Sequence, residues 1–114
     1  EKQVEFALAA NGFIGFESAL PLMNRHLLQT GVVTLERLVE LTSINPAKLF
    51  GLGSGTLRDG EPADILIADM EEEWVFDRFA TASKAKNAPY HGMAMCGRAR
   101  WTIVGGEIVH EHIR

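Results

Sequence analysis

The four histidines are the residues of this chain whose type could support metal chemistry. His110 and His112 lie two positions apart in a segment with strand character, so both side chains are expected on one face, where such a pair can ligate zinc. A third ligand is missing nearby, because no Cys, Asp or further His lies close to the pair in sequence. We therefore expect solvent-facing edge residues at these positions and predict no metal ligand in the chain.

The remaining candidates for catalysis are isolated in sequence. His26 is expected on the exposed face of a helix, and His91 follows a Pro-Tyr turn without a visible partner. A nucleophilic cysteine needs a nearby base or a helix N-terminus, and the neighbours of Cys96 offer neither, so we expect a packed thiol. The residues alone thus predict no complete catalytic site.

Two short patterns invite a functional interpretation that their context does not support. The glycines of residues 51–55, GLGSG, precede a strand and lack the Lys-Ser/Thr ending of a phosphate-binding loop. The three glutamates at 71–73 are interpreted as a solvated turn, because adjacent carboxylates point in different directions and do not form a tuned pair.

Composition limits the chain to one compact unit that does not bind nucleic acid. It has 114 residues, of which 46% are hydrophobic, and a formal charge of −4. Lys and Arg are scattered and form no basic stripe, and no apolar run approaches the roughly 20 residues that span a bilayer. A single cysteine excludes an internal disulfide and fits the cytoplasm. Since the sequence opens on Glu1-Lys2 in a helical pattern, we expect a piece of something longer.

Helices are predicted in the first half of the chain. Residues 4–10 carry an apolar stripe that Asn11-Gly12 ends, and a second helix is expected from about residue 17 to Gly31. Thr34 is a favourable N-cap for a third helix, and a fourth is predicted with Asn45 as its N-cap, Pro46 at its first position and Gly51 as its stop.

Strands are predicted in the second half. Residues 65–68 form a short buried strand ended by Asp69, residues 71–77 form another, and Gly105-Gly106 joins two β-branched runs into a hairpin. Helices first and strands last indicate an α+β layout or pieces of two domains.

The segment NPAKLFGLGSGTLRDGEPADILIAD, residues 45–69, resembles the closing part of the amidohydrolase superfamily. Together with GFIGFESALPL upstream and SKAKNAPYHGMAMCGRARWTIVGGEIV downstream, the order resembles the dihydroorotases of the longer bacterial type, over essentially the whole chain. The resemblance implies an α/β fold: the last helices of a (β/α)8 barrel and a substrate loop in residues 1–52, then strands of a small composite β-sandwich domain in residues 53–114.

Dihydroorotases use zinc to hydrolyse, reversibly, the cyclic amide of dihydroorotate to N-carbamoyl-aspartate in pyrimidine biosynthesis. By this resemblance the metal ligands and the catalytic Asp lie upstream of Glu1, so the chain alone is expected to bind no zinc and to be inactive. The backbone of Asn11 and Gly12 is expected to contact the substrate, since glycine lets backbone groups approach a planar ring. A helix C-cap alone stays open as the role of Asn11.

The resemblance gives the irregular stretch at residues 84–92 a mainly structural role. It implies a crossing between small-domain strands that anchors them against the barrel through Lys84, Lys86, Asn87, Pro89, Tyr90 and Gly92. The expected partners are dihydroorotate and the missing N-terminal part of the barrel, with a homodimer or aspartate transcarbamoylase also possible. Two alternatives stay open, a non-catalytic dihydroorotase-like scaffold and a related cyclic amidase such as a dihydropyrimidinase or allantoinase.

Overall fold

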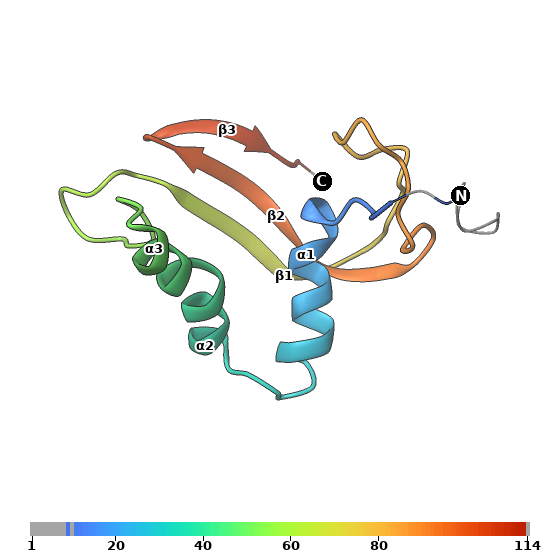
Figure 1. Cartoon of the computed structure of the whole chain (residues 1–114), viewed down its shortest axis with the longest axis horizontal. Helices are drawn as coiled ribbons and strands as arrows, with labels where there is room; N and C mark the ends of the chain where they lie inside the picture. The colour runs from blue at the N-terminus through green and yellow to red at the C-terminus, as the bar shows by residue number, and fades with distance from the viewer. Residues whose placement is uncertain (1–8, 10, 114) are drawn as a thin grey trace.

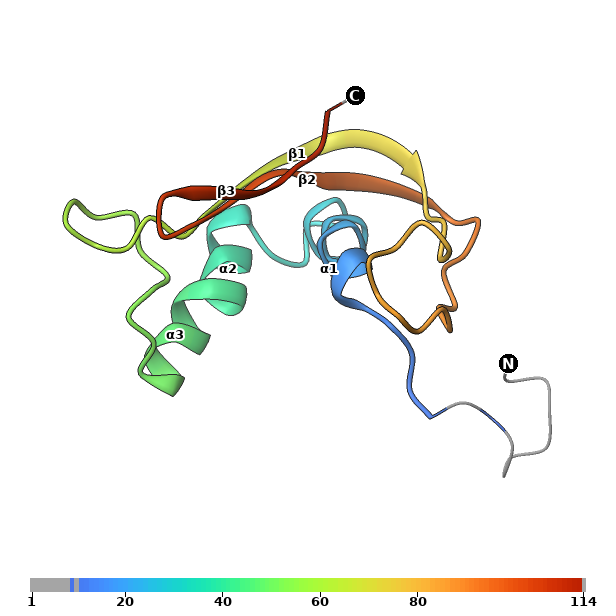
Figure 2. The ribbon, with the colours of Figure 1, turned by 90° about the horizontal axis from the view of Figure 1, so that it is seen from above.

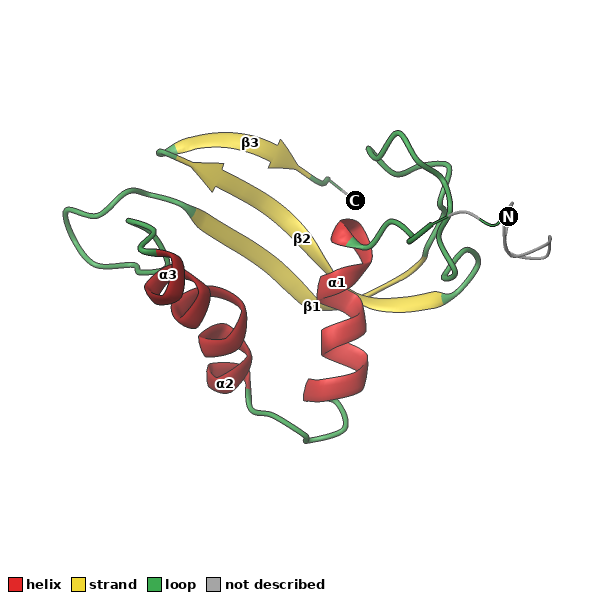
Figure 3. Ribbon diagram, in the orientation of Figure 1, coloured by secondary structure: helices red, strands yellow, loops and turns green. Residues whose placement is uncertain are grey.

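A computed structural model of the chain describes residues 9 and 11–113. Helices cover one face of a three-stranded antiparallel sheet, as Figures 1 and 2 show from two directions. The sheet has the order β1-β2-β3, with β1 at Ile65–Val75, β2 at Ala94–Val104 and β3 at Glu107–Glu111. The predicted order of helices before strands is confirmed, as Figure 3 shows by colour. Most of the helix predicted at residues 4–10 lies outside the described residues.

The first helical rod packs on the sheet. Helix α1, Phe16–Met23, continues without a break into a π-helical turn, η2, at Asn24–Leu28. The predicted continuation of this helix toward Gly31 is confirmed, since the chain turns there with a φ of 71°. Within the rod Pro21 and Ser18 are buried, and α1 contacts β2.

The second helical rod is one continuous run, where the sequence predicted two helices. It comprises α2, Leu35–Val39, the π-helical turn η3, Glu40–Ile44, and α3, Asn45–Phe50. The predicted cap at Thr34 is confirmed, because its hydroxyl accepts a hydrogen bond of 3.2 Å from the Arg37 N–H. The predicted stop is also confirmed, since Gly51 has the left-handed conformation.

The predicted N-cap at Asn45 is wrong. Its φ of −67° and ψ of −45° are helical, whereas an N-cap residue has extended backbone. The π-helical turn before Pro46 explains the continuity. Pro46 has no N–H to donate to the preceding turn. The wider hydrogen-bond spacing of the π-helical turn accommodates this loss, so the rod continues through the proline.

Strand β1 is also one element where two were predicted. Asp69 pairs with Arg98 and Glu73 pairs with Cys96, so residues 70–72 bulge out of the ladder opposite Gly97. The Asp69 Oδ1 atom stabilises the bulge by accepting hydrogen bonds from the backbone N–H groups of residues 71 and 72, at 3.0 and 3.1 Å. Asp69 therefore bends the strand instead of ending it.

The hairpin predicted at Gly105-Gly106 is confirmed, and it joins β2 to β3. Among the described residues the buried core is small, with Leu38, Ala47, Phe76 and Met95 as its hydrophobic members. Large apolar side chains remain exposed, including Phe16 at 97%, Leu57 at 80%, Leu49 at 78% and Phe50 at 73%. In the part of the chain that the structure describes, no helix has both the length and the apolar character needed to cross a membrane.

Candidate functional site

The loop that precedes α1 contains a solvent-exposed glycine with a left-handed backbone conformation. Asn11 and Gly12 are exposed, and Gly12 has a φ of 67° with no heavy atom of the described residues within 4 Å of where a Cβ would lie. This left-handed conformation is accessible to glycine at no steric cost. The structure therefore places backbone at the surface here, with room for another molecule to approach it.

Asn87 lies in the long connection between β1 and β2, 75 positions after Gly12, and binds this loop. Its side-chain Nδ2 donates a hydrogen bond of 2.8 Å to the Gly12 carbonyl, and its own carbonyl accepts one of 3.1 Å from the Ile14 N–H. The two contacts lie on either side of Phe13, whose ring packs edge-on against Tyr90 at 6.0 Å between centroids. Residues 12–14 are thus fixed by residues 87–90.

A second contact ties the same connection to the start of α1. The Glu17 carboxylate accepts a hydrogen bond of 2.9 Å from the Ala82 N–H. The connection is closed on itself by Lys86, whose Nζ donates to the Thr81 carbonyl at 2.8 Å. The connection therefore contacts the loop at residues 12–14 and the start of α1, and the expected anchoring of residues 84–92 against the barrel stays a prediction.

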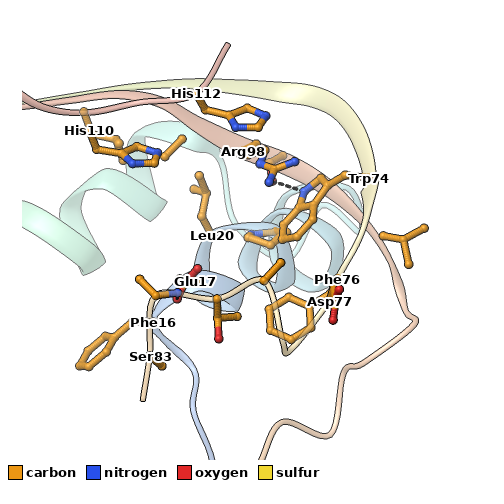
Figure 4. A pocket seen from close by; sticks show the side chains of 18 residues that line it. Phe16, Glu17, Leu20, Trp74, Phe76, Asp77, Ser83, Arg98, His110 and His112 are labelled. Carbon is orange, nitrogen blue, oxygen red and sulfur yellow. Dashed lines mark hydrogen bonds between the residues drawn. The ribbon is translucent and has the colours of Figure 1, made fainter. Parts of the chain in front are cut away.

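A cleft of about 740 Å³ lies between the sheet and α1. Figure 4 shows the side chains of Trp74, Arg98, His110 and His112 from the sheet side and those of Phe16, Glu17 and Leu20 from α1. His110 and His112 line the same cleft, so the prediction that they share a face is confirmed. The Arg98 guanidinium stacks on the Trp74 ring, 4.4 Å from its centroid.

The interpretation of residues 71–73 as a solvated turn is wrong for Glu72. Its side chain is only 10% exposed, and its carboxylate lies 2.9 Å from Arg100, 3.6 Å from Arg98 and 3.5 Å from His112. The alternation of side chains along β1 is the physical reason, since it places Glu72 on the less exposed side with Trp74 and leaves Glu71 and Glu73 exposed. His112 is correspondingly not a free edge residue, because it meets this carboxylate and its N–H donates to the Arg100 carbonyl at 2.8 Å.

The other candidates have structural surroundings. His26 is exposed on the first rod, as expected. His91 has partners that the sequence did not reveal, since its Nδ1 accepts from the Arg78 N–H at 3.3 Å and lies 3.5 Å from the Asp77 carboxylate. Cys96 is half-buried and its Sγ donates to the Met70 carbonyl at 3.3 Å, which confirms the packed thiol.

Metal ligation finds no support in residues 9 and 11–113. No three His, Cys, Asp or Glu side chains among them gather closely enough to hold a metal ion. The pKa of Glu36 departs clearly from its ordinary value. Hydrogen bonds from its own backbone N–H and from the Thr34 hydroxyl lower that pKa, which reflects the helix cap and not a catalytic role.

Relatives of known type share this sequence closely. The chain is 49% identical over 109 residues to a dihydroorotase of Acetivibrio thermocellus, covering 96% of this chain and 26% of that protein. It is 46% identical over 111 residues to a dihydroorotase of Geotalea daltonii, covering 97% and 26%. The resemblance to dihydroorotases is confirmed, and the chain spans about a quarter of the length of the curated relatives it matches.

Solved structures of cyclic amidases have the same fold. L-hydantoinase (dihydropyrimidinase) from Arthrobacter aurescens superposes with a TM-score of 0.83 at 40% identity, covering 90% of this chain and 23% of that one. D-hydantoinase (dihydropyrimidinase) from Thermus sp. gives a TM-score of 0.83 at 24% identity, covering 93% and 24%, and supports the fold alone. The amidohydrolase family model matches residues 10–110, and this chain therefore belongs to the amidohydrolase family.

Proposed function

We propose that this chain is the part of a dihydroorotase that carries a substrate loop at Asn11-Gly12. The full enzyme would hydrolyse the cyclic amide of dihydroorotate reversibly to N-carbamoyl-aspartate, in the cytoplasm and within pyrimidine biosynthesis. Identities of 43–49% to curated dihydroorotases over nearly the whole chain support this assignment.

The observation that carries the proposal is the exposed, left-handed Gly12 held at the surface by Asn87. Among the described residues, no hydrogen bond uses the Gly12 N–H, and its carbonyl keeps a second lone pair beside the bond from Asn87. A planar cyclic amide offers adjacent N–H and C=O groups, so exposed backbone can pair with both. Asn11 would contribute through its backbone in the same way.

The chemistry of the metal is assigned to other segments of the enzyme. Zinc is implied by the dihydroorotase resemblance, but the described residues do not fit a zinc site, since they contain no cluster of three candidate ligands. This part of the chain therefore has no proposed metal ligand. Its proposed task is to orient the substrate.

The proposed architecture of the full enzyme follows the same family. Residues 1–52 would supply the last helices of a (β/α)8 barrel and residues 53–114 the strands of a small β-domain. The exposed side chains of Phe16, Leu49 and Phe50 support this proposal, because such large apolar surfaces mark contact with further polypeptide. The remaining barrel is the proposed partner, and a homodimer or aspartate transcarbamoylase stay predictions.

A hydantoinase or dihydropyrimidinase is the second candidate function. The observation that favours it is the superposition on L-hydantoinase at 40% identity, which approaches the identities to dihydroorotases. Both reactions open a cyclic amide, so the same backbone loop would serve either substrate. A substrate competition assay with the full-length enzyme distinguishes the dihydroorotase from the hydantoinase.

The Gly12 loop gives a direct test. In the full-length enzyme, Gly12→Ala is expected to raise the KM for dihydroorotate about tenfold, because the added Cβ enters the open space where the substrate would meet the loop. The left-handed backbone adds a strain of about 1 kcal/mol. Steady-state kinetics of the purified variant measures the effect.

Gly31→Ala is the matched control. Gly31 also has a left-handed φ, of 71°, with nothing within 4 Å of an added Cβ, and it lies in the turn after the first rod. It should carry the same backbone strain without changing KM. Equal KM values for the wild type and Gly12→Ala would contradict the proposal that this loop contacts the substrate.

A further inference from the structure

We propose that Asn87 is a positioning residue that sets the substrate loop of this enzyme. The inference rests on the proposed function, because it assigns a task to Asn87 only through Gly12. Asn87 acts from 75 positions away in sequence and belongs to a connection that the family resemblance gives a mainly structural role.

The geometry of the two Asn87 contacts fixes the loop more strongly than either contact alone. The bond from Nδ2 to the Gly12 carbonyl restrains the peptide plane between residues 12 and 13, and the bond from the Ile14 N–H restrains the plane between residues 13 and 14. A glycine has the largest backbone freedom of any residue, so an unrestrained Gly12 would sample many conformations. Asn87 therefore selects the conformation in which the Gly12 backbone meets the substrate.

Asn87 is itself held in place on both sides. On one side, the Ala88 N–H donates to the Lys86 carbonyl at 3.1 Å. On the other side, the Gly92 N–H donates to the carbonyl of Phe76 at 2.8 Å, and Phe76 is only 2% exposed. The position of the Asn87 amide is thus defined by the end of β1 and by the core.

The side-chain amide of Asn87 is also expected to change the hydrogen-bonding strength of the loop backbone. A hydrogen bond donated to the Gly12 carbonyl polarises that peptide group and makes the N–H of Phe13, in the same peptide group, a stronger donor. An aspartate at position 87 has the same shape, but its carboxylate cannot donate to the Gly12 carbonyl and would repel it. Asparagine is therefore the residue type that this position requires.

The test uses the full-length enzyme with Asn87→Ala, Asn87→Asp and Ser83→Ala. Ser83 lies in the same connection and makes neither of the two contacts to residues 12–14, so it serves as the matched control. Both Asn87 variants should raise the KM for dihydroorotate about tenfold, the effect of losing one hydrogen bond, with a smaller change in kcat. Hydrogen exchange at the Ile14 amide should accelerate in Asn87→Ala, while Ser83→Ala should match the wild type in every readout.

Each possible result decides the proposal. Faster exchange at Ile14 together with an unchanged KM would overturn it, because Asn87 would then restrain the loop without any effect on substrate binding. Wild-type KM in Asn87→Asp would overturn it as well, and this isosteric variant keeps the test decisive if Asn87→Ala fails to fold. A wild-type enzyme that opens neither dihydroorotate nor hydantoin would defeat the proposed function and this inference together, and the defect would then be visible before any substitution.

Discussion

Replacing Glu72 with alanine is expected to lower the free energy of unfolding by about 3 kcal/mol. The carboxylate is 10% exposed and is shared by Arg98, Arg100 and His112, so its removal leaves two guanidinium groups close together without their counter-charge. Urea unfolding followed by tryptophan fluorescence measures the loss, since Trp74 and Trp101 both lie in the sheet.

Glu71→Ala is the matched control for this prediction. Glu71 precedes Glu72 in the same bulge, and its side chain is exposed. Substitutions at such exposed positions change stability by about 0.5 kcal/mol or less. If both variants lost the same stability, the inward-facing carboxylate would not be the group that joins β1, β2 and the segment after β3.

Asn24→Ala is expected to cost a similar amount, about 3 kcal/mol. Asn24 is 4% exposed, and its Nδ2 donates to the carbonyls of Met70 and Cys96, both at 2.9 Å. Its loss would leave two carbonyls at the helix-sheet contact without their donor. Gly97 makes room for this amide, because a Cβ there would lie 3.2 Å from the Asn24 Nδ2 atom.

Arg25→Ala provides the comparison for Asn24→Ala in the same urea experiment. The neighbouring Arg25 also reaches the sheet, through a bond of 3.3 Å to the Ala94 carbonyl, but this contact is exposed. An exposed contact of this kind contributes about 0.5 kcal/mol. Equal losses at positions 24 and 25 would contradict a buried link between the first rod and the sheet.

Local signals predicted the parts of the fold that depend on a few neighbouring residues. The cap at Thr34, the left-handed stop at Gly51 and the hairpin at Gly105-Gly106 each use a residue type that suits one backbone geometry. These features need no distant contact. Sequence alone was sufficient for them.

Features that depend on distant partners were missed. Asp69 has the residue type of a strand end, but pairing with β2 on both sides of it carries β1 through the bulge. Glu72 was interpreted as solvated, because its partners Arg98 and Arg100 are more than 25 positions away and meet it only in the folded sheet. Asn45 failed as a cap for a related reason, since the π-helical turn before it keeps the rod continuous.

In the candidate site, too, one part was predicted from the sequence and another part was missed. Gly12 was predicted as a substrate contact by resemblance to dihydroorotases, and its exposed, left-handed backbone fits the role proposed for it. The contact from Asn87 was not predictable from either stretch, because a side-chain amide and a backbone carbonyl carry no sequence signal of pairing. The Asn-Ala-Pro-Tyr stretch at residues 87–90 indicated only an irregular connection.

The central claim is that the full enzyme opens the ring of dihydroorotate. The most direct measurement compares initial rates of the full-length protein on dihydroorotate and on hydantoin, with cyclisation of N-carbamoyl-aspartate as the reverse reaction. We predict a kcat/KM for dihydroorotate at least about a hundredfold above that for hydantoin, because dihydroorotate carries a carboxylate that hydantoin lacks and a site that pairs with this group rejects the analogue without it. Equal or faster hydrolysis of hydantoin would assign the chain to a hydantoinase, and no turnover of either compound would favour the non-catalytic scaffold.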